Sequence, residues 1–266
     1  MPATDDEHAS ARALGLAGAD CAEWHTRCEL AALYRLAAHF RMTDLIDTHI
    51  SARLPQQPGQ FLINRYGVLF HEMRASDLVK VDDEGRALQV GPAALAGQRV
   101  NKAGFTIHSA VHKARPELHF VIHTHTSAGM AVAAQQAGLL PISQHALKFY
   151  GKLGYHDYEG IALDLAERER LVAALGSHRA LILRNHGLLA AGSTAAEAFH
   201  EIYFLERACQ AQVAALAGGQ PLNLPPEAVR LRTAAQFDND NASGIIDLAW
   251  QSALRLIQGE GSGYRC

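Results

Sequence analysis

Two short apolar segments that carry histidines constrain this chain most strongly. LHFVIHTHT covers residues 118–126 and is rich in β-branched side chains, whereas RALILRNHG covers residues 179–187. Pro116 precedes the first segment, and the second runs into Gly187. Apolar runs of this length between turn residues are typical of buried strands. The sequence therefore predicts two inner strands of a sheet, each delivering histidines towards its end.

The spacing of these histidines indicates a metal site. His123 and His125 are separated by one residue, so on a strand both side chains point to the same face. Two neutral imidazoles placed in this way can chelate one cation. His186 precedes a glycine turn and can supply a third ligand, which leaves an open position as in catalytic zinc sites. The pattern also fits a second interpretation, in which these histidines satisfy hydrogen bonds inside the core.

Composition excludes several classes of function. The chain has 266 residues, of which 48% are apolar and 19% charged, with a formal net charge of -3. No Lys/Arg-rich run is present, so we expect no nucleic-acid partner. No stretch approaches about 18 consecutive apolar residues, so we expect no membrane partner. The acidic start and the four sparse cysteines predict no signal peptide and no disulfide framework, and hence a cytoplasmic protein.

Periodicity divides the chain into three parts. We expect a flexible N-terminal segment over residues 1–20, a mixed α/β domain over 21–222, and a linker with a last helix over 223–266. Strands and helices do not alternate strictly, which argues against a doubly wound fold. The predicted helices cover residues 22–40, 104–114, 127–136, 161–176, 192–218 and 245–256. The other predicted strands cover residues 49–55, 60–67 and 77–85.

Several longer motifs resemble a known family. They are THISARLP, FLINRYGVLFHEMRASDLVKVD, NKAGFTIHSAVHKARPELHFVIHTHTSAGMAVAA, GLLPISQHALKFYG and LILRNHGLLAAGSTAAEAFHEIYFLERAC. In this order, and spanning Arg27 to Ala217, they resemble the class II aldolase/adducin N-terminal family, especially the adducin head and its bacterial relatives. The resemblance implies a three-layer α/β/α sandwich around a largely antiparallel sheet. It also implies a homotetramer with sites at subunit interfaces.

The resemblance further implies that His123, His125 and His186 bind one divalent metal per subunit. Zinc is the expected metal, with iron and manganese as alternatives. The sugar-phosphate aldolases of this family carry a glutamate as general base, and the matching position here is Gly104. The residues that hold the substrate phosphate there are replaced around Lys102 and Ala103 and near His49. We therefore do not expect a phosphorylated sugar as substrate.

Other side chains are candidates for handling the proton. His145 lies in a region that is near the metal in this family and has a side chain suited to proton transfer near neutral pH. His108 and His112 share one face of a predicted helix. All three histidines also suit a supporting or surface role.

Tyrosine and lysine side chains complete the set of candidates. Tyr150 is a candidate because a tyrosine assists protonation in the aldolases, although Tyr155 and Tyr158 fit that role as well. Lys102 is a candidate for binding an anionic group of the substrate.

Three functions fit these features. The first is a metal-dependent lyase that performs retro-aldol cleavage or decarboxylation on a small, non-phosphorylated carbonyl compound. The second is an Fe(II) oxygenase with three histidine ligands, a class that some relatives resemble. The third is a non-catalytic scaffold like the adducin head. Cytoskeletal binding is not expected, since no basic tail follows residues 223–266 in the sequence.

Overall fold

The alternation of side chains along the strands builds apolar cores on both faces of the sheet. We describe a computed structural model that covers residues 3–18, 21–54, 56–88, 100–162, 164–240, 242–259 and 263–266. On the central strand β4 (Phe120–Thr124), Ile122 packs into one core and Val121 into the other. Successive residues of a strand point to opposite faces, so a sheet whose inner strands are apolar throughout must be covered on both sides.

Within the described residues, seven strands form one sheet in the order β3-β2-β1-β4-β7-β6-β5. All neighbouring pairs are antiparallel except β5 and β6, which are parallel. The remaining strands are β1 (His49–Arg53), β2 (Phe61–Asn64), β3 (Leu78–Val81), β5 (Leu153–His156), β6 (Ala180–Leu183) and β7 (Gly187–Gly192).

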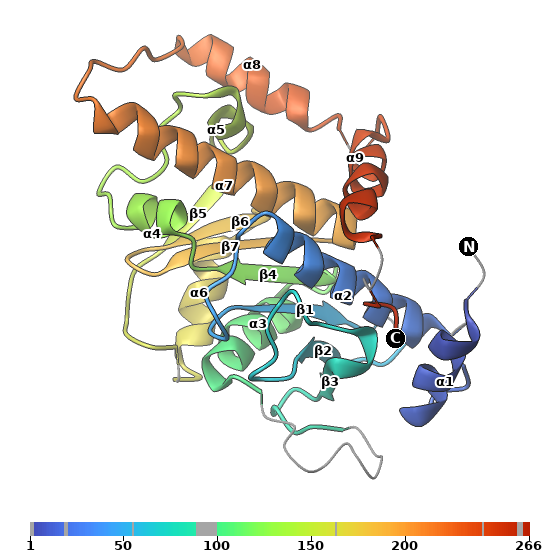
Figure 1. Ribbon diagram of the computed structural model, residues 1–266. Coiled ribbons are helices and arrows are strands. Elements are labelled where there is room, and N and C mark those ends of the chain that lie inside the picture. Colours follow the sequence, from blue (N-terminus) through green and yellow to red (C-terminus); the bar gives the residue numbers. More distant parts are fainter. Residues whose placement is uncertain are drawn as a thin grey trace.

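Helices cover both faces of this sheet (Figure 1). Helices α2 and α7 pack over β1, β4 and β7 on one face, while α3 and α6 cover the other. The result is a three-layer α/β/α arrangement around a largely antiparallel sheet, which confirms the predicted fold class. The helices are α1 (Asp5–Ala13), α2 (Ala22–His39), α3 (Lys102–Ala114), α4 (Ser127–Ala133), α5 (Gln144–Lys148), α6 (Glu167–Leu175), α7 (Ala195–Ala217), α8 (Glu227–Phe237) and α9 (Ile245–Leu254).

Several elements differ from those the sequence predicts. Strands β5 and β7 and helices α5 and α8 form where no such element was expected. The segment predicted to be loosely packed contains α1, which begins with a capping box between Thr4 and Glu7 and buries Ala11. A capping box satisfies the first backbone N–H groups of a helix and so favours this local structure. The proposed boundaries at residues 21 and 222 remain predictions.

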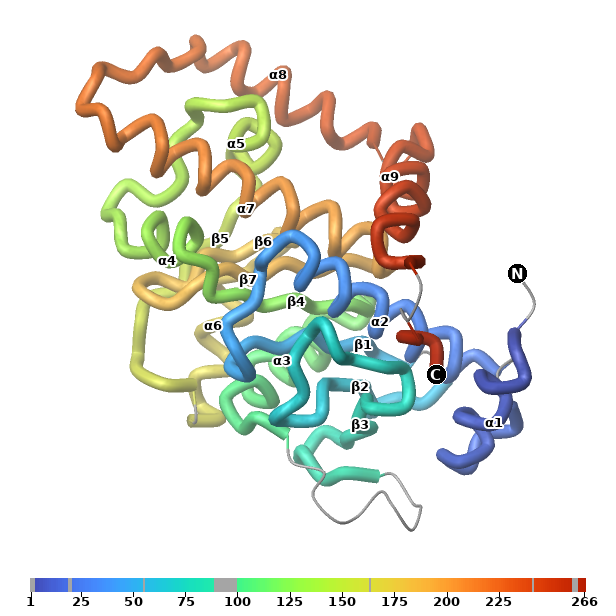
Figure 2. The backbone as a smooth tube through the Cα atoms, viewed as in Figure 1, coloured from blue at the N-terminus to red at the C-terminus, as the bar shows by residue number. Residues whose placement is uncertain are grey.

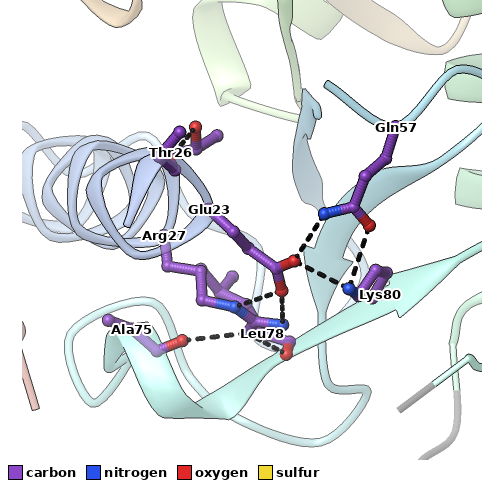
Figure 3. A network of polar contacts seen from close by, with 8 residues as sticks. Glu23, Thr26, Arg27, Gln57, Ala75, Leu78 and Lys80 are labelled. Atoms are coloured by element: carbon purple, nitrogen blue, oxygen red, sulfur yellow. Dashed lines mark hydrogen bonds and ion pairs between the residues drawn. The ribbon is translucent and has the colours of Figure 1, made fainter. Parts of the chain in front are cut away.

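A buried polar cluster joins α2 to the edge of the sheet (Figure 3). Arg27 pairs with Glu23 at 3.0 Å and donates further hydrogen bonds to the carbonyls of Ala75 and Leu78. The other carboxylate oxygen of Glu23 accepts from Lys80 at 2.7 Å. Burial alone would raise the pKa of the Glu23 carboxyl, but the Lys80 hydrogen bond and the Arg27 charge together lower it. With Gln57, which also donates to Glu23, these side chains form what we call the Glu23 network.

The end of the chain returns to this edge (Figure 2). Backbone N–H groups of Ala75 and Ser76 donate to the carbonyls of Tyr264 and Cys266, and Arg265 forms an ion pair with Glu7 of α1. Among the helices of the described part of the chain, none is both long enough and apolar enough to cross a bilayer.

Candidate metal centre

Three neighbouring strand ends bring the predicted ligands together. His123 lies within β4, and His125 lies one residue beyond the end of that strand. His186 occupies the turn between β6 and β7, and β7 pairs directly with β4. The prediction that His125 is part of the strand is therefore wrong, because the ladder to β7 ends at Thr124. The imidazoles of His123 and His125 nevertheless lie side by side, with ring centroids 4.6 Å apart.

A glycine allows these two chain segments to approach closely. Asn185 has a left-handed backbone with φ of 56°, which turns the chain after β6. A Cβ atom on Gly187 would lie 2.3 Å from the carbonyl oxygen of Thr124 and 3.1 Å from the ring of His125. Any side chain at position 187 would push the turn and its histidine away from β4. The close approach of Thr124 and His125 thus explains the glycine in the Asn-His-Gly sequence.

The metal-binding nitrogen atoms converge on one point. Nε2 of His125 lies 2.8 Å from Nε2 of His123 and 3.0 Å from Nε2 of His186. Ligand atoms of all three residues lie within 4.8 Å of one another, as a single cation requires. Three imidazole nitrogens in this arrangement suit zinc, and also iron or manganese. We refer to these residues as the three-histidine cluster.

The opposite nitrogen atoms of two rings are held by the protein. Nδ1 of His123 donates to the carbonyl of Leu188 at 2.9 Å, and Nδ1 of His125 lies 3.1 Å from a carboxylate oxygen of Asp44. Such contacts fix the tautomer in which Nε2 carries the lone pair. Burial and the neighbouring histidines lower the pKa of His123 well below its ordinary value and that of His186 to about 4. His123 and His186 are therefore neutral near pH 7, the form in which an imidazole can bind a metal.

His49 fills the space in front of Gly104. The two residues face each other because β1 and α3 pack together, and His49 pairs with His123 across β1 and β4. A Cβ atom at position 104 would lie 2.5 Å from Cδ2 and 2.8 Å from Nε2 of His49. The His49 ring also lies against His123, with centroids 5.0 Å apart. An imidazole thus stands where a side chain at position 104 would begin.

The remaining candidate residues lie elsewhere in the described structure. His145 stacks on Phe204 of α7 with ring centroids 4.8 Å apart, and Tyr150 lies under the guanidinium of Arg230. Lys102 is exposed at the start of α3. None of the described contacts joins these three side chains to the three-histidine cluster, so their proposed roles remain predictions.

Tyr158 is the tyrosine that approaches the cluster in this chain. Its ring centroid lies 6.3 Å from that of His186, and its side chain is 53% exposed. Both residues line one small pocket together with the buried pair of His156 and Glu167, which is 3.0 Å apart. The hydroxyl of Tyr155, by contrast, accepts a hydrogen bond from the backbone of Leu139.

Two functional contacts were missed by sequence reasoning. Asp44 sits in the loop after α2, 81 positions before its partner His125. His49 was noted as a replaced phosphate-binding residue, not as a neighbour of the metal ligands. Neither contact has a local sequence signal, because both arise from the packing of distant segments.

Comparison with known proteins agrees with this fold and identifies the family. The family model described as Class II Aldolase and Adducin N-terminal domain matches residues 28–213. A Caulobacter vibrioides protein that carries an aldolase class 2 name is 51% identical over 245 residues, which cover 91% of this chain and 93% of that protein. Alpha-adducin of Rattus norvegicus is 46% identical over 200 residues, which cover 74% of this chain and 27% of adducin.

Solved structures give the same result. An aldolase II superfamily protein from Pseudomonas syringae is 48% identical, with a TM-score of 0.85 over 92% of this chain and 96% of its own. An L-fuculose 1-phosphate aldolase from Glaciozyma antarctica PI12 is 27% identical, with a TM-score of 0.80 over 100% of this chain and 97% of its own. The three-layer fold of this chain is thus the fold of class II aldolase structures. The chain belongs to the class II aldolase and adducin N-terminal domain family, as its sequence motifs predict.

Proposed function

We propose that this protein is a divalent-metal-dependent lyase that cleaves a carbon–carbon bond next to a carbonyl group in a small, non-phosphorylated substrate. The convergence of three Nε2 atoms carries the proposal. A divalent ion held there acts as a Lewis acid, which stabilises an enolate in retro-aldol cleavage or decarboxylation. Small-molecule substrates and divalent metals are typical of class II aldolases, and zinc is the metal we propose here.

The residues of the chain have separate tasks in this proposal. His123, His125 and His186 hold the cation, while Asp44 and the carbonyl of Leu188 orient two of these rings. Oriented ligands keep the coordination geometry constant through the reaction. Tyr158, whose ring centroid lies 6.3 Å from that of His186, can donate its phenolic proton to a substrate bound at the cluster.

The surroundings of Gly104 argue against a sugar phosphate as substrate. A glutamate at this position has no room while His49 remains in place, since even its Cβ atom would meet the ring. The resemblance also implies that a phosphate-binding residue of the sugar-phosphate aldolases is replaced near His49. We therefore propose that the substrate is a hydroxy acid or a keto acid without a phosphate group.

Metal content and turnover test the proposal together. His123→Ala should lose at least one order of magnitude in zinc affinity, because one of three ligands and its hydrogen bond to Leu188 are removed. Exposed His71→Ala is the matched control and should bind zinc as the wild-type protein does. Both proteins are purified, loaded with zinc, measured by elemental analysis, and assayed for product release with a panel of hydroxy and keto acids.

The outcomes separate the alternative functions. A zinc-loaded wild-type protein that cleaves no member of the panel, together with unchanged zinc binding by His123→Ala, contradicts the proposal. Iron as the native metal favours an oxygenase instead. If removal of metal changes no measurable property of the protein, the result favours a scaffold role, in line with the similarity to alpha-adducin. A tetramer, which is common in this family, is expected in gel filtration with light scattering.

A further inference from the structure

A line of buried polar side chains leads away from the three-histidine cluster into the layer between the sheet and α3. Nδ1 of His49 lies 2.7 Å from Nε2 of His108, and Nδ1 of His108 lies 2.5 Å from Oγ of Ser51. The same Oγ lies 2.7 Å from Nε2 of His112. All four side chains are buried, with at most 4% of each residue exposed. We call these four residues the histidine chain.

The secondary structure sets this arrangement. His49 and Ser51 are two residues apart on β1 and so face α3 together. His108 and His112 are four residues apart on α3 and therefore share the face that packs on β1. Each element contributes alternate members, so the order of contacts runs along the strand from His49 towards Arg53.

Both ends of the histidine chain carry a free ring nitrogen. Nε2 of His49 has no hydrogen-bond partner among the described residues, and it lies beside Gly104, at the end of β1 where His49 pairs with His123. At the other end, Nδ1 of His112 is buried and forms no hydrogen bond of regular geometry in the described structure, although the backbone of Leu118 is close enough to raise the pKa of this ring. His112 lines a surface pocket of about 200 Å³ together with Asp83 and Lys113.

Counting hydrogens shows that the histidine chain has two equivalent states. Three neutral imidazoles and one hydroxyl own four exchangeable hydrogens, and the three contacts need one hydrogen each. When the Ser51 hydroxyl donates to one of its two neighbouring rings, the fourth hydrogen sits at one end, on Nε2 of His49 or on Nδ1 of His112. In the first state all three rings are Nε2–H tautomers, and in the second all three are Nδ1–H tautomers.

The rings themselves do not store an extra proton. Burial lowers the pKa of His108 well below its ordinary value, and burial with the nearby charge of Arg53 lowers the pKa of His112 to about 3. An imidazolium in the middle of the histidine chain is thus disfavoured near pH 7. A proton that arrives at one end is matched by one that leaves at the other.

We propose that the histidine chain is a proton path between the metal centre and the pocket at His112. A substrate proton passes to Nε2 of His49, whose Nδ1 hydrogen moves to Nε2 of His108. The Nδ1 hydrogen of His108 moves to Oγ of Ser51, and the hydroxyl hydrogen moves to Nε2 of His112. The Nδ1 hydrogen of His112 then leaves to a water molecule that enters from the pocket lined by His112, so no ring changes its net charge.

This path adds a route for the substrate proton to the proposed function. The transfer of a substrate proton itself rests on that proposed function. It assigns His49 as the group that touches the substrate, in place of a carboxylate at Gly104. His108, Ser51 and His112 are positioning residues that act through His49. The transfer of hydrogen along the path is independent of which substrate is bound.

Nuclear magnetic resonance of ¹⁵N-histidine-labelled protein tests the path without substrate. Protonated and bare imidazole nitrogens have well-separated ¹⁵N shifts, and signals are assigned with single histidine-to-glutamine variants. In metal-free protein, His49, His108 and His112 should share one tautomer, or the same mixture of both. Addition of Zn²⁺ alone should shift all three towards Nδ1–H, because a nearby cation favours a bare Nε2 on His49.

Substitutions of the hydroxyl group provide the decisive comparison. Ser51→Ala should abolish the response of His112 to Zn²⁺ while His49 and His108 still respond together. Ser51→Thr keeps a hydroxyl and should restore the response. Ser109→Ala is the matched control, since Ser109 is a buried serine on α3 that donates to the backbone of Phe105 outside the path.

Two results would overturn the proton path. One is a different tautomer for any of the three rings in metal-free wild-type protein, which needs neither zinc binding nor a folded variant. The other is a His112 response to Zn²⁺ that is absent in wild type, or equally strong in Ser51→Ala. A protein that binds no Zn²⁺ at the cluster contradicts the proposed function, while the shared tautomers still decide the path.

Discussion

The Glu23 network and the histidine chain are both buried polar clusters, but they solve the problem of burial in opposite ways. The Glu23 network keeps its charges and compensates them, since Glu23 is in contact with Arg27, Lys80 and Gln57. The histidine chain gives up charge altogether and leaves a nitrogen atom open at each end.

The difference indicates what each cluster is for. Buried charges are tolerated when they are paired and hydrogen-bonded, and a fully satisfied pair holds its elements in one arrangement. A neutral line of groups that are both donors and acceptors has two arrangements of equal bond count, so hydrogens can move while heavy atoms stay in place. The Glu23 network anchors α2, whereas the histidine chain can transmit a proton.

The largest expected effect comes from breaking the Glu23 network. Arg27→Ala should lower the free energy of unfolding by about 3–5 kcal/mol, because it leaves the Glu23 carboxylate buried with fewer partners. Urea denaturation followed by circular dichroism measures the change. Exposed Arg86→Ala, which removes an ion pair with Asp82, is the control and should scarcely move the urea midpoint. Equal shifts in both variants would show that Arg27 is no anchor.

The substitution Gly104→Ala should disturb the histidine chain at its end near the three-histidine cluster. Its Cβ atom would meet the His49 ring at 2.5 Å, so the ring or α3 must move, at a cost of about 1–3 kcal/mol. The ¹⁵N signals of His49 should move as well. Gly218→Ala, where nothing lies within 4 Å, is the control for the change of residue type. An unchanged stability and an unmoved His49 signal in Gly104→Ala would contradict the proposed packing.

The response to acid should separate the two clusters by pH. The folded-state pKa of His112 is about 3 against 6.5 when unfolded, so between these values the unfolded chain binds a proton that the folded protein does not. Stability conferred by His112 is therefore lost as pH falls below about 6.5, by roughly 1.4 kcal/mol per pH unit. The Glu23 carboxyl has a lowered pKa, so its contribution disappears at more acidic pH, below 4.5.

Unfolding of metal-free protein in urea between pH 5 and pH 6.5 measures this effect. His112→Gln should reduce the slope of stability against pH by about one proton, relative to wild type and to the exposed control His71→Gln. The same slope in wild type and His112→Gln would mean that the imidazole of His112 is already protonated in the folded protein.

Local patterns in the sequence were sufficient for a large part of this structure. The period of apolar residues placed α2 and α7 to within three residues, and the motifs around His123 and His186 indicated the family and the three histidines that the fold brings together. These features depend on residues that are close in sequence or on a long collinear resemblance, and both can be recognised without a structure.

The missed features depend on contacts between distant segments. Strand β7 has the sequence GLLAAG, whose small residues do not favour a strand until β4 and β6 pair with both of its edges. The role of His49 likewise follows from its place opposite Gly104, 55 positions away in the sequence. Gly104 looked like the loss of a base, whereas the structure shows that it makes room for an imidazole.

The pairing of β4 with β7 has a consequence for how the site is assembled. The ladder sets His123 opposite Leu189, so the histidine faces α3 while Ile122 enters the core under α7. A slip of one residue would exchange these faces, burying an imidazole among aliphatic side chains and scattering the ligands. A cation that binds all three histidines therefore stabilises the correct register alone. During refolding, a bound cation would therefore favour the native strand register over shifted registers, whether or not substrate is present.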